Sequence, residues 1–189
     1  MEPLEALARA DAEFDRRLRA ITPDDLDRVT PCDGWTVRDL VNHIVIGNRA
    51  SVVLLEGGSR EDGMALFGTD ALGDDYLVAY EDSVADARAA FAEPGALDLT
   101  VHHAMGDIPA PQLLGFRIAD LTLHAWDLAR AVGADEQLDS ELLEHVLESL
   151  LPMKPFIGTI GVFGEGPSGD VGDDAPVQLR VLDLTGRRP

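Results

Sequence analysis

Residues 116–130 combine acidic and imidazole side chains at helical spacing within an otherwise apolar segment. Asp120 and His124 are four residues apart, so on a helix both side chains project from one face, about one turn apart. A carboxylate oxygen and an imidazole nitrogen at that spacing can bind one metal ion, each about 2 Å from it. Asp127 extends the same face by three more residues. This segment therefore offers two metal ligands and a neighbouring carboxylate.

The apolar surroundings of this segment require partners for its polar side chains. Leucine, isoleucine and alanine occupy several sides of the expected helix, and a buried aspartate or histidine is costly without a partner. A metal ion would satisfy both Asp120 and His124. A helix-face ion pair or a buried hydrogen bond would satisfy them too, and the pair taken alone favours that plainer interpretation.

A second segment offers a further ligand, His43, which lies among leucine, valine and isoleucine on another expected helix. A lone histidine on an apolar face is usually a satisfied core residue. Together with Asp120 and His124, however, it would form a set of two histidines and one carboxylate with open coordination positions. Three protein ligands leave room for water or a substrate, which is typical of a catalytic metal site.

Cys32 is the only cysteine, which excludes an internal disulfide and a zinc site built from several thiolates. It lies in a predicted turn over residues 30–35, and no basic residue flanks it in the sequence. A packed side chain is therefore favoured over a nucleophile. Trp35 and Trp126 are interpreted as core anchors of the two motif helices.

Apolar periodicity predicts four long amphipathic helices with short connections, an all-α helical bundle. The predicted spans are 3–20, 37–56, 74–91 and 111–132. Thr36 with Asp39 has the pattern of a capping box at the start of the second helix. Residues 59–72 are expected to form a loop, and 97–109 either a small hairpin or an irregular extended link.

Shorter elements are expected after the bundle, within one domain that covers residues 1–189. Residues 140–151 have a helical pattern, and 177–184 form a short final element. Between them, the acidic Gly/Pro/Asp segment 164–176 is predicted to be a loop, either a lid or a tail.

The charge balance limits the classes of partner. Fifteen Lys and Arg against 35 Asp and Glu give a net charge of −20 over 189 residues. Such a chain repels phosphate backbones and anionic lipid headgroups, so no nucleic-acid or membrane partner is expected. Neither a signal sequence nor an apolar run of the roughly 20 residues of a membrane helix is recognisable. The sequence therefore predicts a cytoplasmic protein, with a homodimer as one option.

Two separated motifs carry a family resemblance. The segment TPCDGWTVRDL at residues 30–40 with His43, followed by Asp120-x-x-x-His124-x-Trp-Asp-Leu-Ala, resembles the N-terminal domain of mycothiol-dependent maleylpyruvate isomerase, in the DinB/YfiT-like superfamily. The resemblance implies a DinB-like four-helix bundle in a short single-domain member. It also implies a divalent metal on His43, Asp120 and His124, with Zn²⁺ expected and Ni²⁺, Fe²⁺ or Mn²⁺ as alternatives. The isomerase has glutamate where this chain has Asp120, which is one methylene shorter.

A metal ion with open positions can hold a small thiol as thiolate near neutral pH. The expected function is therefore transfer of a mycothiol-like thiol to a small electrophile, or isomerisation of that electrophile. The three ligands would not act as bases. Asp127 would orient a ligand from behind, or equally well form a cap or an ion pair with Arg117 or Arg130. A non-catalytic metal-binding or stress-associated protein, or a bundle with a purely polar network, stays an alternative.

Overall fold

The computed structural model describes residues 1–158 and 164–188. Contacts within the chain define two compact units, Glu2–Glu136 and, together with Met1, Gln137–Pro189. The first unit contains the bundle and every residue of the candidate site. The expectation of a single domain over 1–189 stays a prediction.

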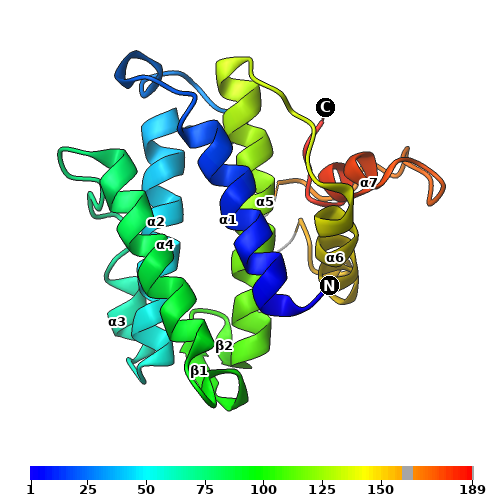
Figure 1. The fold of residues 1–189 in the computed structure, drawn as a ribbon. Helices are drawn as coiled ribbons and strands as arrows, with labels where there is room; N and C mark the ends of the chain where they lie inside the picture. Colours follow the sequence, from blue (N-terminus) through cyan, green and yellow to red (C-terminus); the bar gives the residue numbers. More distant parts are fainter. Residues whose placement is uncertain (159–163, 189) are drawn as a thin grey trace. The chain divides into compact units, whose positions relative to one another are not determined.

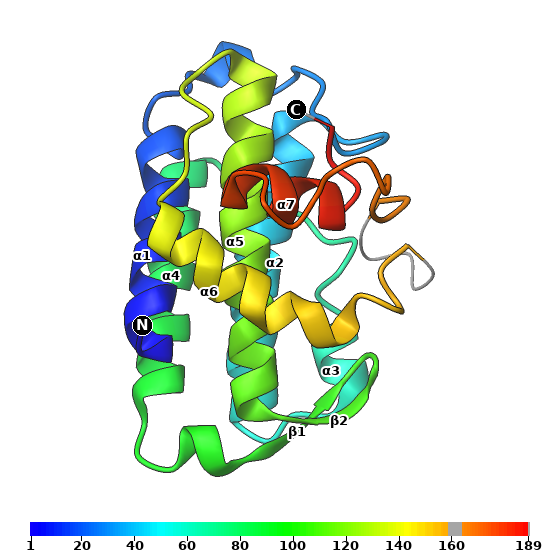
Figure 2. The ribbon, with the colours of Figure 1, turned by 90° about the vertical axis from the view of Figure 1, so that its right-hand side faces the viewer.

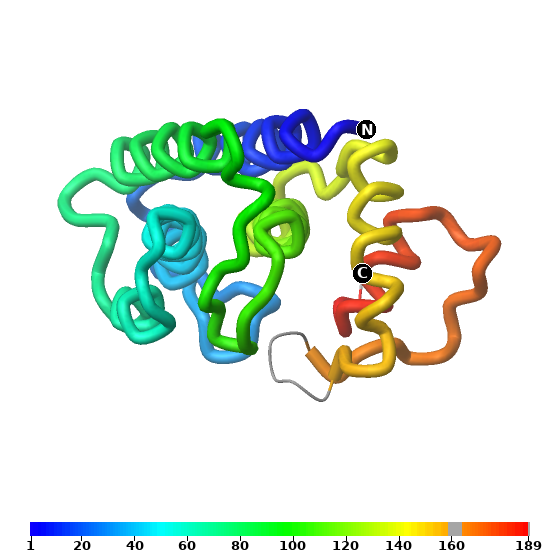
Figure 3. Tube along the Cα trace, turned by 90° about the horizontal axis from the view of Figure 1, so that it is seen from below, coloured from blue at the N-terminus to red at the C-terminus, as the bar shows by residue number. Residues whose placement is uncertain are grey.

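Four long helices form the first unit, as the periodicity predicts. They are α1 (Pro3–Leu18), α2 (Val37–Leu55), α4 (Tyr76–Ala92) and α5 (Ala110–Val132). Helix α1 packs on α4 and α5, and α2 packs on the same two helices, so the four close into a ring (Figure 3). Helices α2 and α4 run in one direction, opposite to α1 and α5 (Figure 1).

Local sequence signals fix the ends of the two site helices. The Thr36 hydroxyl accepts from the backbone N–H of Asp39, and the Asp39 carboxylate accepts from the backbone N–H of Thr36 at 2.9 Å, which confirms the predicted capping box. At the other end of the motif region, α5 stops at Gly133, whose φ of 72° is left-handed. Glycine adopts that conformation without steric cost.

The connections differ from the sequence expectation at one place. Residues 59–72 were expected to be a loop, but the short helix α3 (Arg60–Met64) lies within them. Ser59 and Asp62 cap it with the same reciprocal hydrogen bonds that start α2. At about five residues the helix is too short to give an apolar period, so only its cap could have indicated it.

Residues 97–109 contain a small hairpin, which is the first of the two structures predicted for them. Strands β1 (Thr100–His103) and β2 (Gly106–Pro109) pair antiparallel with Val101 opposite Ile108. Strand β1 contacts α2, α3 and α5, which places the hairpin at one end of the bundle beside α3 (Figure 2). Single-turn 3₁₀ helices complete the secondary structure: η1 (Pro23–Asp25), η2 (Ala96–Asp98) and η3 (Leu151–Met153).

The second unit is small and helical. It contains α6 (Ser140–Leu150) and α7 (Val177–Leu184), which pack on each other, as predicted. The segment 164–176 has no helix or strand, in agreement with the predicted loop, and its Ser168 backbone N–H donates to Asp183 at 3.1 Å. No helix in the described part of the chain is long and apolar enough to cross a membrane.

Candidate metal centre

Helices α2 and α5 bring the three predicted ligands together. His43 Nε2 lies 3.2 Å from Asp120 Oδ2 and 3.4 Å from Oδ1. His124 Nε2 lies 3.2 Å from Asp120 Oδ1. The side chains of His43 and Asp120 are each 26% exposed, against 10% for His124, so the cluster opens to solvent on the His43 side.

The distances fit a metal ion. In a tetrahedral zinc site with ligands at about 2.0–2.1 Å, neighbouring ligand atoms are about 3.3 Å apart. Both nearest separations of the Asp120 oxygens from histidine Nε2 atoms are 3.2 Å, and one atom from each of the three residues lies within 4.8 Å of the others. Two imidazoles and one carboxylate are also a donor set that zinc, nickel, iron and manganese accept.

Asp127 holds His124 from the opposite side of the ring. Its Oδ2 lies 2.9 Å from His124 Nδ1, and its side chain is 1% exposed. A carboxylate there favours a proton on Nδ1 and leaves Nε2 to face Asp120. This contact is the one that an orienting carboxylate would make, and the role of Asp127 stays a prediction.

Electrostatics in the cluster favour charged side chains. Burial opposes ionisation of Asp120, but the nearby charges of His43, His124 and Arg117 outweigh it and hold the pKa of Asp120 well below its usual range. Burial likewise disfavours the His124 cation, yet the Asp120 charge and hydrogen bonds to Asp120, Asp127 and Cys32 raise the pKa of His124 well above its usual range. Asp120 is thus a ready anionic ligand, whereas His124 must lose a proton to bind a metal.

Three further side chains lie beside the ligands. Arg117 was considered from the sequence as an ion-pair partner of Asp127, but its Nη1 donates to Asp120 Oδ2 at 2.6 Å, at a spacing of three residues on one helix. Cys32 Sγ lies 3.4 Å from Asp127 Oδ2 and 3.8 Å from His124 Nδ1. The Phe67 ring lies 6.2 Å from that of His43. No local pattern links Cys32 or Phe67 to residues so distant in sequence.

The two tryptophans have different environments. Trp126 is 1% exposed, as expected of a core anchor. Trp35 was expected in the core as well, but it is half-buried and covers the ligand rings, with centroid distances of 4.9 Å to His43 and 5.8 Å to His124. It precedes α2 instead of lying within it, so the helical periodicity does not determine its burial.

A second ligand set shares His124. Cys32, His124 and Asp127 also offer atoms within 4.8 Å of one another. This set would use Nδ1 of His124, whereas the first uses Nε2. The two sets therefore require different tautomers of the His124 imidazole, one with Nε2 free and one with Nδ1 free. Substitutions at Cys32 and Asp120 distinguish the two sets.

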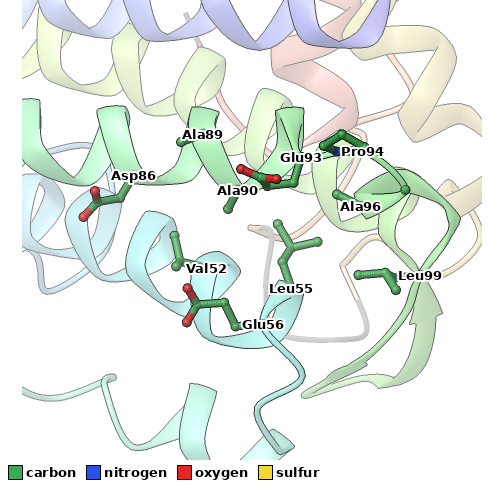
Figure 4. A pocket seen from close by; sticks show the side chains of 11 residues that line it. Val52, Leu55, Glu56, Asp86, Ala89, Ala90, Glu93, Pro94, Ala96 and Leu99 are labelled. Atoms are coloured by element: carbon green, nitrogen blue, oxygen red, sulfur yellow. The ribbon is translucent and has the colours of Figure 1, made fainter.

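A cavity of about 730 Å³ lies apart from these residues. It is a groove between α2 and α4, with Val52 and Leu55 facing Ala90 and three carboxylates, Glu56, Asp86 and Glu93, among its lining residues (Figure 4). None of the residues of either ligand set lines it.

Comparison with known proteins identifies the family. The sequence model of the mycothiol maleylpyruvate isomerase N-terminal domain matches residues 7–129. The chain belongs to this family. The matched region contains His43, Asp120, His124 and Asp127, and it covers most of the first compact unit.

Relatives of this family member extend the match. It is 32% identical over 180 residues to an uncharacterized protein of Mycobacterium tuberculosis, in strains CDC 1551 / Oshkosh and H37Rv, over 93% of this chain and 89% of the relative. The crystal structure of the mycothiol-dependent maleylpyruvate isomerase superposes with a TM-score of 0.64 at 22% identity, over 80% of this chain and 68% of that chain. A histidine-to-alanine mutant of that isomerase gives 0.63 at 20% identity over the same shares. The fold is therefore the DinB-like helical bundle of the isomerase.

Proposed function

We propose that this chain binds one divalent metal ion through His43, Asp120 and His124. We also propose that it transfers a small thiol of the mycothiol type to a small electrophile, or uses that thiol to isomerise the electrophile. The observation that carries the proposal is the convergence of two histidine Nε2 atoms on one carboxylate, each at 3.2 Å. Zn²⁺ is the first candidate, and Ni²⁺, Fe²⁺ and Mn²⁺ are alternatives for the same donors.

The ligands and the side chains around them would have different roles in this reaction. A bound ion supplies stabilisation of the thiolate near neutral pH. Its three protein ligands are not bases. Asp127 would fix the ring of His124 through Nδ1, and the rings of Trp35 and Phe67 flank His43. In the transfer, the thiolate would form a C–S bond by adding to an electrophilic C=C bond, the π-electron pair would move onto an adjacent carbonyl, and water would supply the proton. In the isomerisation, that electron pair would return after rotation about the carbon–carbon bond and expel the thiolate.

Family membership supports the thiol. The solved isomerase is mycothiol-dependent by name, and this chain shares its N-terminal domain family. A small-molecule thiol and a small electrophile are accordingly the proposed partners. Cytoplasmic location and a homodimer stay predictions.

Metal content is the first test. Protein purified without a metal-affinity tag should contain about one ion per chain by elemental analysis, and His43→Ala and His124→Ala should each lose it, because two remaining ligands hold an ion weakly. Absence of an ion from the folded wild-type protein, or full occupancy in His124→Ala, would exclude this ligand set.

Two further variants separate the ligand sets that share His124. Asp120→Ala should lose the ion, whereas Cys32→Ser should keep it. The opposite pattern would place the ion on Cys32 and Asp127 instead. In both variants circular dichroism confirms the helical fold before metal is measured.

Thiol binding separates an enzyme from a non-catalytic metal-binding protein. A calorimetric titration with mycothiol should show binding to the metal-loaded protein and none to the metal-free protein. Loaded protein that binds no thiol would favour the alternative function, a metal-binding or stress-associated bundle.

A further inference from the structure

Arg117 lies behind the candidate metal centre, between α5 and α2, and is only 6% exposed. Its Nη1 donates to Asp120 Oδ2 at 2.6 Å. Its Nη2 donates to Asn48 Oδ1 at 3.0 Å and to the Ile44 carbonyl at 3.4 Å. One guanidinium therefore ties the acidic ligand on α5 to the helix that carries His43.

Asn48 is itself held in place. Its Nδ2 donates to the Ser83 hydroxyl at 3.1 Å, and that hydroxyl donates to the Tyr80 carbonyl at 2.8 Å. Asn48 and Ser83 are 2% and 1% exposed. A buried series of hydrogen bonds thus crosses from α4 through α2 to α5 and ends on Asp120. Both terminal nitrogens of the Arg117 guanidinium have acceptors, whereas its Nε has none in the described structure. Linked hydrogen bonds of this kind fix side-chain positions more firmly than isolated pairs do.

Helix α2 makes space for the guanidinium at Gly47. A Cβ atom there would lie 2.2 Å from Arg117 Nη1 and 2.8 Å from Cζ. Glycine inside a helix is unfavourable relative to alanine, so its presence here needs a reason, and Arg117 provides one. Because the obstacle is the end of a flexible side chain and not backbone, alanine would displace the guanidinium and leave the helix intact.

We propose that Arg117 is a positioning residue of the metal centre, held by Asn48 and given space by Gly47. It engages Oδ2 of Asp120, which also lies 3.2 Å from His43 Nε2. Oδ1 is left facing both histidines, 3.2 Å from His124 Nε2 and 3.4 Å from His43 Nε2. The inference rests on the metal site of the proposed function. Arg117 would contribute to the metal affinity although it does not itself bind the ion. Without Arg117, the carboxylate of Asp120 would rotate and lose its orientation toward the histidines.

Cobalt(II) tests this role, because its visible absorption reports the number and arrangement of its ligands. Arg117→Gln should bind Co²⁺ about 10- to 100-fold more weakly than the wild type and should change the visible spectrum. Arg117→Lys should restore part of the affinity, since an ammonium keeps the charge but cannot span Asp120 and Asn48 with a planar fork. Arg17→Gln is the matched control, because Arg17 is equally buried and bonds to Glu13 and Asp135 instead.

Gly47→Ala tests the same role without changing Arg117, because residue 47 has no side chain that could contact Asp120. It should reproduce the weaker binding and the altered spectrum of Arg117→Gln. In an Arg117→Ala background, where the obstacle is absent, the same alanine should have no further effect on Co²⁺ binding. This cycle assigns the effect to displacement of the guanidinium.

The outcomes are distinct. Wild-type affinity and spectrum in Arg117→Gln, or in Arg117→Lys and Gly47→Ala if the glutamine variant does not fold, would overturn the positioning role while the metal site stands. A wild-type protein that binds no Co²⁺ would instead overturn the metal site. Loss of binding in Arg17→Gln as well would show that the effect is one of general stability, and would also overturn the positioning role.

Discussion

At the scale of single residues, the candidate centre depends on contacts behind the ligands as much as on the ligands. His124 is the clearest case, because Asp127 contacts its Nδ1 and Asp120 faces its Nε2. The ring nitrogen of His124 that would meet the proposed ion is therefore selected by Asp127, a residue that would not face the ion.

This arrangement predicts the effect of Asp127→Asn. The amide keeps the volume of the buried side chain but removes the charge that fixes the tautomer, so metal affinity should fall about 10- to 100-fold, measured by competition with a chelator. Cys32→Ser is the comparison, since it changes only a thiol beside the same carboxylate. Equal affinity in Asp127→Asn and wild type would mean that another group orients His124.

At the scale of elements, periodicity was enough to predict the helices that carry the ligands, but not the contacts between them. The span of α2 and its Thr36 cap follow from local sequence, as does the i, i+4 placement of Asp120 and His124 on α5. Asn48 and Arg117 are 69 positions apart, and Cys32 and Asp127 are 95 apart. Such contacts arise from helix packing, which no local pattern encodes. The short α3 was missed because a single turn has no period.

The cap of α2 gives a prediction at this scale. Thr36→Ala removes the acceptor for the Asp39 N–H at the start of the helix that carries His43, and should lower the free energy of unfolding by about 1 kcal/mol, measured by urea denaturation. Ser59→Ala breaks the same box on the five-residue α3 and should have a smaller effect, because α3 can fray without unfolding the bundle. A larger effect at Ser59 would contradict this ranking.

At the scale of the whole molecule, stability should depend on a buried carboxyl in α1. Asp11 is 6% exposed, and its Oδ2 has no hydrogen-bond partner in the described structure. Burial raises its pKa to about 7, with Asp15 adding to the rise, against the opposing charges of Arg88 and Arg117. The folded state therefore binds a proton that the unfolded state has released between about pH 4 and pH 7, so this group lowers stability as pH rises through that window.

Asp11→Asn should remove this dependence. The unfolding free energy of the variant minus that of the wild type should increase by about 3 kcal/mol from pH 5 to pH 8. Urea denaturation at both pH values measures this change. Asp39→Asn offers a contrast, because hydrogen bonds with Thr36 lower the pKa of that carboxyl. A wild-type minus Asp11→Asn difference that is constant with pH would show that Asp11 is ionised throughout.

The distance along the chain between the proposed ligands has a consequence for how the protein would acquire an ion. His43 and Asp120 are separated by 77 positions, and no partial set before α5 contains more than one of the three ligands. If the proposed ion binds to this set, a nascent chain could not capture it with all three ligands until α5 has been synthesised and has closed the ring of helices. Metal loading would then be a late event that could not guide folding. The metal-free bundle would have to persist on its own, and its charges are matched in pairs, Arg117 with Asp120 and His124 with Asp127.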